Sequence, residues 1–164
     1  MSKQFLIFFA VGVVVIAGAV STILYTHKGA HLELKGEILK IRTGSLSDND
    51  SIAILDFRVE NISDVPFVVR EVVVTAEKPD GGTAESVMIS KMDLHQLFQF
   101  NRFLGDQYND ALSLKDTIPP HAKVDRMVAA RFDMPNKVLE SVKTIHMSIQ
   151  DVDGPLFETS KSPK

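Results

Sequence analysis

Residues 53–60 read AILDFRVE, and the alternation in this short stretch indicates the class of fold. Its apolar and charged side chains fall on opposite faces of an extended chain: Ala53, Leu55, Phe57 and Val59 on one face, and Asp56, Arg58 and Glu60 on the other. Successive side chains of a β-strand point to opposite sides of the sheet. The pattern therefore predicts a half-buried antiparallel strand, with its apolar face in a core and its charged face in water.

Turn signals and further extended stretches lie on both sides of this strand. Toward the C-terminus, residues 61–64 (NISD) predict a turn. The β-branched run of residues 66–76 (PFVVREVVVTA) then predicts a strand that ends in a hairpin at residues 79–82, PDGG. Toward the N-terminus, residues 32–41 alternate with one change of phase, which we attribute to a bulge beside Gly36.

The later part of the chain contains one helical pattern among further strands. Residues 91–104 (KMDLHQLFQFNRFL) have helical spacing, and Gly105 after them is a natural C-terminal cap. Shorter stretches predict strands around residues 111–114, 121–132, 145–149 and 156–157, and a helical turn at residues 138–142 that crosses between sheets. Short strands with turns between them are typical of a β-sandwich.

Together these elements predict a mainly β chain with a single sandwich domain. We expect an immunoglobulin-like antiparallel β-sandwich over residues 31–160, with one inserted α-helix at about residues 91–104 and a tail at residues 161–164. A segment of this length is large enough to bury an independent hydrophobic core. The cysteine pair and the tryptophan of true immunoglobulin domains are absent, because the chain has no residue of either type.

An uncharged stretch precedes the sandwich. Residues 5–25 read FLIFFAVGVVVIAGAVSTILY, and as an α-helix they would extend roughly 30 Å, the thickness of the hydrocarbon core of a bilayer. The stretch predicts a transmembrane anchor, with a short head at residues 1–4 and a juxtamembrane link at residues 26–30. We expect a single-pass membrane protein whose C-terminal domain is extracytoplasmic, on the periplasmic side in a bacterium, because so short a head most simply stays in the cytoplasm.

A cleaved signal peptide is the alternative interpretation of the same residues. Lys3 would be its basic start, and residues 17–19 (AGA) would be a cleavage site of the A-x-A type. The apolar run continues to Tyr25, which makes it longer than the usual core of a signal peptide. We therefore expect the segment to be retained.

Two stretches resemble a known family of small domains. Residues 55–81, LDFRVENISDVPFVVREVVVTAEKPDG, and residues 121–135, HAKVDRMVAARFDMP, are similar to the central and later strands of immunoglobulin-like domains of the late-embryogenesis-abundant and water-stress/hypersensitive-response (WHy) kind. The shared features are a strand ending in Asn, a Ser-Asp turn, a Val-rich strand and an Asp-Gly hairpin. The resemblance implies a membrane-tethered domain without catalysis. The helix at residues 91–104 departs from the family's pattern.

The composition excludes several kinds of chemistry. The absence of cysteine excludes disulfides, thiol catalysis and cysteine-ligated metals. With 18 basic and 21 acidic residues, the chain lacks the basic clusters that nucleic-acid binding requires. The sequence also contains no GxSxG motif, no glycine-rich phosphate loop before a helix and no HExxH pattern. We therefore expect no nucleic-acid partner, no catalytic residues and no cofactor.

Two acidic loops are the places where a calcium ion could bind. Residues 48–50 (DND) and residues 151–154 (DVDG) space their acidic oxygens two residues apart, but no Glu follows at the EF-hand offset. Asp and Asn are also frequent turn formers. We predict no metal site and keep calcium as the alternative. Residues 61–63 (NIS) match an N-glycosylation sequon, for which the turn role is the simpler explanation.

The helix at residues 91–104 has more apolar residues than one sheet can cover. Its apolar side chains occupy well over half of the helical circumference: Met92, Leu94, Leu97, Phe98, Phe100, Phe103 and Leu104. A helix packed on one sheet needs an apolar stripe of only about 100°. The surplus indicates either deep burial between the sheet and a loop or a second apolar surface for a partner or for the bilayer interface. The candidate partner-binding residues are Phe100, Phe103, Leu104 and Leu97, with Phe100 and Phe103 foremost.

These features favour a protein-binding function at a membrane. We expect a non-enzymatic, membrane-anchored β-sandwich that acts as an accessory subunit of a membrane complex and binds another membrane protein. One alternative is a small-ligand or metal-binding extracytoplasmic domain that uses the loop carboxylates. Another is a stress-related stabilising module, which is the class that the family resemblance implies.

Overall fold

The computed structural model describes residues 3–27 and 32–163, without the side chains of part of the first helix and of Arg102. The chain divides into two compact units, Met1–His31 and Leu32–Lys164, and each is described here by itself. The predicted head at residues 1–4 and the predicted link at residues 26–30 lie partly outside the described residues.

The first unit contains helix α1, Lys3–His27, which includes the whole uncharged stretch. The side chains that are described between residues 8 and 22 are all exposed. Within the described part of the chain, no helix is both long and apolar enough to cross a membrane.

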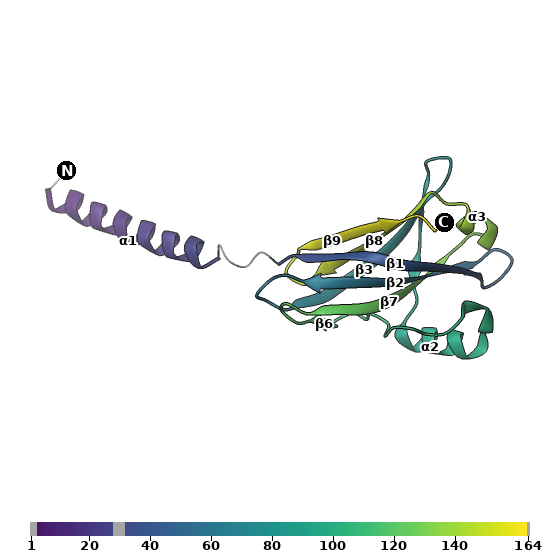
Figure 1. Cartoon of the computed structure of the whole chain (residues 1–164). Coiled ribbons are helices and arrows are strands. Elements are labelled where there is room, and N and C mark those ends of the chain that lie inside the picture. The colour runs from purple at the N-terminus through teal and green to yellow at the C-terminus, as the bar shows by residue number, and fades with distance from the viewer. Residues whose placement is uncertain (1–2, 28–31, 164) are drawn as a thin grey trace. The chain divides into compact units, whose positions relative to one another are not determined.

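The second unit consists of two antiparallel β-sheets (Figure 1). The first sheet has the order β1-β2-β7-β5, formed by β1 (Leu34–Ser45), β2 (Ser51–Asn61), β7 (Lys123–Phe132) and β5 (Val87–Met88). The second sheet has the order β4-β3-β8-β9, formed by β4 (Thr83–Glu85), β3 (Phe67–Glu77), β8 (Thr144–Asp151) and β9 (Leu156–Lys161), and β6 (Thr117–Ile118) also pairs with β3. The prediction of a mainly β chain that folds as a sandwich is therefore confirmed.

Three short helical segments complete the second unit: α2 (Lys91–Phe100), the 3-10 helix η1 (Arg102–Leu104) and α3 (Asn136–Glu140). Helix α3 connects β7 of the first sheet to β8 of the second, as the helical turn predicted at residues 138–142 should. The stretch at residues 111–114, which we predicted as a strand, forms only a single bridge from Ala111 to Met127. A strand there would need a neighbour to pair with, and the loop crosses β7 at only that point.

The main core lies between the two sheets and contains the predicted inward face of β2. Ala53, Leu55, Phe57 and Val59 are all fully buried. Facing residues of β3 and β8 complete this core, among them Val69, Val74, Ala76, Ile145, Met147 and Ile149. The alternation of residues 53–60 therefore identified the correct core-facing side of β2.

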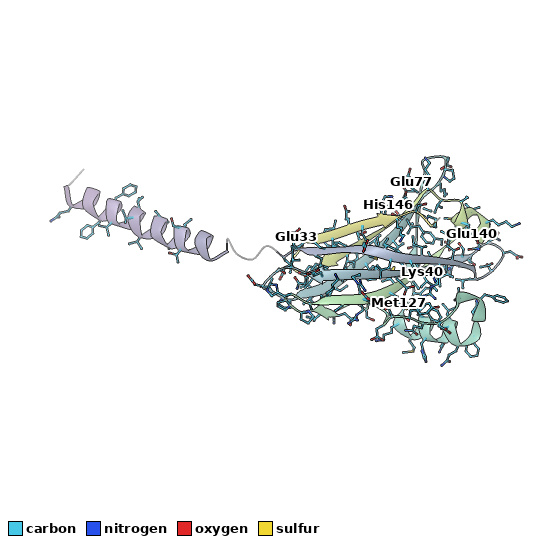
Figure 2. The ribbon with its side chains drawn as sticks, in the orientation of Figure 1. Glu33, Lys40, Glu77, Met127, Glu140 and His146 are labelled. Atoms are coloured by element: carbon cyan, nitrogen blue, oxygen red, sulfur yellow. The ribbon has the colours of Figure 1, made fainter. Side chains whose placement is uncertain are left out.

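Part of the opposite face of β2, at residues 52–56, is covered, which corrects the prediction of a half-buried strand there, whereas Arg58 and Glu60 are partly exposed. Ile52 and Ile54 are fully buried, and Asp56 is nearly so. They face a second cluster, called here the outer core, which consists of Ile52, Ile54, Leu94, Leu104, Ala111, Met127 and Ala129. Because α2 and η1 supply Leu94 and Leu104 to this cluster, part of β2 is covered on both faces. Met127 of β7 belongs to the same covered face (Figure 2).

The bulge in β1 lies three residues later than predicted. The pairing of β1 with β2 skips Leu39, between the pairs Ile38–Phe57 and Lys40–Asp56. Gly36 pairs regularly with Val59, and its role is close approach, because a Cβ atom there would clash with the backbone oxygen of Arg58. A bulge inserts one unpaired residue and reverses the alternation beyond it.

Candidate docking site

Helix α2 begins at a side-chain cap. Ser90 Oγ accepts a hydrogen bond from the backbone N–H of Asp93 (3.2 Å) and donates one to the Asp93 carboxylate (2.7 Å). The first turn of a helix leaves backbone N–H groups without helical partners, and this cap satisfies one of them. The sequence S-x-x-D at residues 90–93 therefore determines where the helix starts.

The helix ends earlier than residue 104. The last helical contact is from the N–H of Asn101 to the carbonyl oxygen of Leu97, at 2.8 Å. The chain then tightens into η1, and Gly105 follows at φ +74°, a conformation that glycine adopts without strain. The predicted helix over residues 91–104 is therefore two segments with a break at Asn101.

Two of the four predicted partner-binding residues face the domain itself. Leu104 is 3% exposed and lies in the outer core, so its side chain is not accessible to a partner. Leu97 is partly buried against the same cluster, together with Phe98. The break at Asn101 turns η1 toward the sheet, which a helical-wheel projection of residues 91–104 does not anticipate.

The other two predicted residues point away from the domain. Phe100 is 85% exposed and Phe103 is 100% exposed, and Met92 on the same helix is 74% exposed. We call Phe100 and Phe103 the aromatic pair. Some of the surplus apolar side chains therefore form the outer core, and the aromatic pair is exposed on the surface.

Arg42 holds the segment after the helix against the sheet. Its guanidinium donates to the carboxylate of Asp56 at 2.9 Å and to the carbonyl oxygens of Leu104 and Asp106, each at 2.8 Å. Asp56 receives a further hydrogen bond from the side-chain amide of Asn109, at 2.9 Å. The pair is well buried, with side-chain exposures of 11% for Arg42 and 5% for Asp56.

Aromatic rings enclose the same guanidinium. The Arg42 Cζ atom lies 5.5 Å from the ring centre of Phe98 and 5.2 Å from that of Tyr108. Lys40, labelled in Figure 2, places its ammonium 5.5 Å from the Tyr108 ring. Cations at this distance from a ring face are attracted by its quadrupole. Arg42 therefore organises the whole segment from Phe98 to Asn109.

Sequence reasoning missed this arrangement. Arg42 and Asp56 are diagonal neighbours on β1 and β2, because Lys40 pairs with Asp56 and Arg42 pairs with Ile54. That register depends on the bulge at Leu39, so it could not be counted from the sequence. The charges of Arg42 and Asp56 were nevertheless a clue, because a charged side chain that becomes buried needs a polar partner.

Two grooves flank the segment that leads into α2. The first, called the β3 groove, has a volume of about 760 Å³ and is lined by Arg70, Glu71, Val72, Met88, Ile89, Ser90, Lys91, Leu112, Ser113 and Leu114. The second, called the α2 groove, has a volume of about 460 Å³ and is lined by Val87, Met88, Ile89, Asp93, Gln96, Leu97, Phe100 and Arg131. Because both share Met88 and Ile89, the two grooves and Phe100 belong to one region of the surface.

The acidic loops form turns. Asp50 accepts a hydrogen bond from Ser47 Oγ at 2.8 Å and lies 3.3 Å from Arg131. Asp151 is buried and accepts from the backbone N–H groups of Val68 (2.6 Å) and Asp153 (2.7 Å). Among the described residues, no three histidine or acidic side chains converge as a metal site would require.

Asn61 of the sequon also has a structural role. It is fully buried, and its side-chain amide donates to the carbonyl oxygens of Val65 (2.8 Å) and Ile118 (3.0 Å). Its own oxygen accepts from the backbone N–H and the hydroxyl of Ser63. These contacts close the turn between β2 and β3, as the NISD pattern predicted.

One exposed ion pair lies on β2 and β7 away from the helix. Arg58 donates two hydrogen bonds to Asp125, at 2.6 and 2.8 Å. These hydrogen bonds hold the pKa of the Asp125 carboxyl below its ordinary value and raise the pKa of Arg58. Both side chains are more than a third exposed, so solvent screens the interaction.

No family model and no curated protein matches the sequence. Among solved structures, a protein from Archaeoglobus fulgidus is 18% identical, with a TM-score of 0.40 over 79% of this chain and 98% of that chain. An uncharacterized β-sandwich protein from Clostridium difficile 630 is 16% identical, with a TM-score of 0.35 over 79% of this chain and 80% of its own. An apag protein from Pseudomonas aeruginosa PAO1 is 12% identical, with a TM-score of 0.34 over 71% and 93%. Likenesses of this size carry no argument about function.

Proposed function

We propose that this chain is a non-enzymatic, membrane-anchored β-sandwich that binds another protein through the aromatic pair. The observation that carries the proposal is the exposure of Phe100 and Phe103 on a segment whose Leu94 and Leu104 are buried. Burying a phenylalanine side chain contributes about 1.5–3 kcal/mol. Two exposed rings close together in sequence therefore make a strong anchor for a partner, and aromatic anchors are enriched at binding hot spots.

The contacts on both sides of the aromatic pair support a docking role. The aromatic pair lies between Leu97, which packs on the outer core, and Leu104, which is buried in it. Arg42 holds the residues that follow. Since a partner gains little affinity from side chains that must first be ordered, anchors on a fixed element bind at a lower entropic cost.

The segment that carries the aromatic pair lies beside the later part of β1. The chain enters the first sheet at Leu34, and Leu104 packs beside Gly44, ten residues along β1. Figure 1 shows α2 beside the end of the sheet opposite to the start of β1. At the usual rise of a strand, ten residues span about 33 Å. The segment that carries the aromatic pair thus lies toward the end of β1 that is distant from Leu34.

The membrane anchor is part of the same proposal and is supported by the sequence. Residues 5–25 hold no charged side chain, and α1 spans all of them. We place the sandwich on the extracytoplasmic side, as an accessory subunit of a membrane complex. Kinship with the WHy domains and an immunoglobulin-like strand arrangement are proposed on the motifs of residues 55–81 and 121–135.

A double substitution tests the docking role. Phe100→Ser with Phe103→Ser should leave the unfolding midpoint of the full chain in mild detergent unchanged, because both rings are exposed. The variant should lose a membrane protein that co-purifies with the wild type and is identified by mass spectrometry. Val152→Ser with Leu156→Ser is the matched control, since it removes two exposed apolar side chains at the turn between β8 and β9.

Two results would count against this role. If the Phe100 and Phe103 variant unfolds at a lower denaturant concentration than the control, the rings stabilise the domain itself. If it retains every co-purifying protein, the partner binds elsewhere.

Two measurements test the anchor. The intact mass of the membrane-extracted protein should correspond to a chain that retains residues 1–19, and a mass that begins near Val20 would show a cleaved signal peptide. Protease added to spheroplasts should digest the sandwich. Complete protection in intact spheroplasts, with digestion after lysis, would place the sandwich in the cytoplasm.

A further inference from the structure

Strand β3 has an interruption in its pairing along one edge. On one side it pairs with β8 from Val69 to Glu77. On the other side, β4 covers Thr75–Glu77 and β6 covers Phe67 and Val68. Between these two neighbours lies a stretch of β3, residues 70–73, that borders the β3 groove.

The backbone groups of Val72 point into this interruption. Alternate residues of a strand direct their N–H and C=O groups to the same edge. On this edge, Lys78 N–H donates to Gly82 (2.8 Å), and the Val74 carbonyl accepts from Ser86 Oγ (2.6 Å). Val72 lies two residues before Val74, so its N–H and C=O groups point to this same edge. Among the described residues, no group forms a hydrogen bond with its backbone from this side.

The loop after η1 limits the interruption at its other end. Val69 donates to the carbonyl oxygen of Asp116 at 2.9 Å and accepts from the N–H of Lys115 at 2.7 Å. The backbone groups of Val69 also face this edge. The alternation along β3 changes here, because the β3–β8 register shifts between Val69 and Glu71. The unpaired stretch is therefore bounded at both ends and is about 13 Å long at the usual rise of a strand.

A change of sheet explains why the stretch has no neighbour. Residues 83–85 pair with β3 in the second sheet, whereas residues 87–88 pair with β7 in the first. The chain thus leaves the edge of β3 at Ser86 and moves across the sandwich. The β3 groove is the space that this crossing leaves between the sheets.

The side chains around the groove suit an extended and acidic segment. Leu114 is 65% exposed, and Met88 and Ile89 are partly buried, so the floor and rim are largely apolar. Arg70 and Lys91 are exposed, and neither forms an ion pair with another described residue. With Glu71 as the opposing charge, the groove carries a net positive charge from its lining.

We infer that the β3 groove binds an extended peptide segment of a protein partner, which adds to β3 as a short strand at Val72 and directs acidic side chains toward Arg70 and Lys91. Strand addition to an exposed sheet edge gives main-chain hydrogen bonds, and adjacent pockets select the side chains. This inference deepens the proposed function, because the same partner would meet the aromatic pair across the segment shared by the two grooves.

The first test is amide hydrogen exchange on the full chain in mild detergent. In the free chain, the Val72 amide should exchange at least tenfold faster than that of Val73, which faces β8. The peptide acetyl-Asp-Thr-Val-Thr-Val-Thr-Asp-amide should then slow exchange at Val72 at least tenfold. The same peptide with its five central amides methylated should have no effect, since it cannot complete the ladder.

Variants of the groove separate the contributions. Leu114→Ser and Arg70→Glu should each weaken peptide binding about fivefold or more, the first by loss of apolar contact and the second by charge reversal. Lys137→Glu is the control, because it makes the same charge change on the exposed helix α3, away from the groove. Phe100→Ser with Phe103→Ser should leave the binding of this peptide unchanged.

Three results would overturn the inference: slow exchange at Val72 in the free chain, no protection by the peptide at 1 mM, or equal protection by the methylated peptide. Each can occur while the aromatic pair still captures its partner. Loss of the docking role with preserved peptide binding would instead contradict the proposed function alone.

Discussion

Replacing Arg42 with alanine tests what holds the segment after α2 in place. The change removes the buried ion pair with Asp56 and the hydrogen bonds to the carbonyl oxygens of Leu104 and Asp106. It also removes the cation between the rings of Phe98 and Tyr108. We therefore expect both a loss of global stability and a local release of the segment that follows α2.

The magnitude follows from the burial of the charge left behind. Removing one partner of a buried ion pair costs about 3–5 kcal/mol. Asp56 keeps the hydrogen bond from Asn109, so we expect the lower end, about 3 kcal/mol, for Arg42→Ala. The reverse change, Asp56→Ala, leaves the Arg42 cation with two carbonyl oxygens and two rings. Its expected cost is therefore smaller, about 2 kcal/mol.

The assay is urea unfolding of the full chain in mild detergent, followed by circular dichroism of the β-sheet. The two single variants and the double variant form a thermodynamic cycle, for which we expect a coupling energy of about 2 kcal/mol. Amide exchange of residues 98–109 should rise at least tenfold in Arg42→Ala. Arg58→Ala, which breaks the exposed pair with Asp125, is the control and should cost much less.

A loss below about 1 kcal/mol for Arg42→Ala, the range of ordinary surface changes, would show that the Arg42–Asp56 pair does not stabilise the domain. Additive single variants would contradict the expected coupling, since residues in direct contact should be coupled. A loss of global stability without faster amide exchange at residues 98–109 would mean that Arg42 stabilises the sheet but does not hold these residues.

Three further predictions follow from the packing and the charges. Phe57→Ala should cost about 3–5 kcal/mol in the same unfolding assay, because the ring is fully buried in the main core, and a loss below about 1 kcal/mol would contradict its placement. Gly36→Ala should cost about 1–3 kcal/mol, since the new Cβ would clash with the backbone of Arg58, and an unchanged midpoint would show that β1 can shift freely. Asp125→Asn should flatten the acid side of the pH–stability profile. The lowered pKa of Asp125 gives stability above the ordinary value of 3.8, and this stability is lost as the pH falls through the folded value. A profile identical to the wild type would show that the pair contributes nothing.

The strands of the main core could be predicted because their signal is local. The alternation of residues 53–60 depends only on the direction of successive side chains, which every strand shares. The turn at residues 61–64 and the hairpin at residues 79–82 could also be predicted, because Asn, Asp and Gly each favour turn conformations locally. These features needed no knowledge of what each strand packs against.

The errors occurred where the outcome depends on a distant segment. Ile52 and Ile54 are buried in a cluster to which distant segments contribute, among them α2 with Leu94 and η1 with Leu104. The bulge lies at Leu39 because the register of β1 is decided by its pairing with β2. The stretch at residues 111–114, predicted as a strand, forms only one bridge, to Met127, because pairing also depends on how a distant strand runs beside it.

The sandwich, the start of α2 at Lys91 and the excess of apolar residues on the segment that ends at Leu104 could all be predicted from the sequence. Those are consequences of residue type and periodicity along one stretch of chain. Only the tertiary structure decided which apolar residues are buried, by breaking the helix at Asn101 so that Leu104 turns inward while Phe100 and Phe103 stay exposed. A side chain is buried only when another surface of the protein packs against it. The position of η1 depends on Arg42 and Asp56, which meet only after β1 and β2 have paired across the bulge.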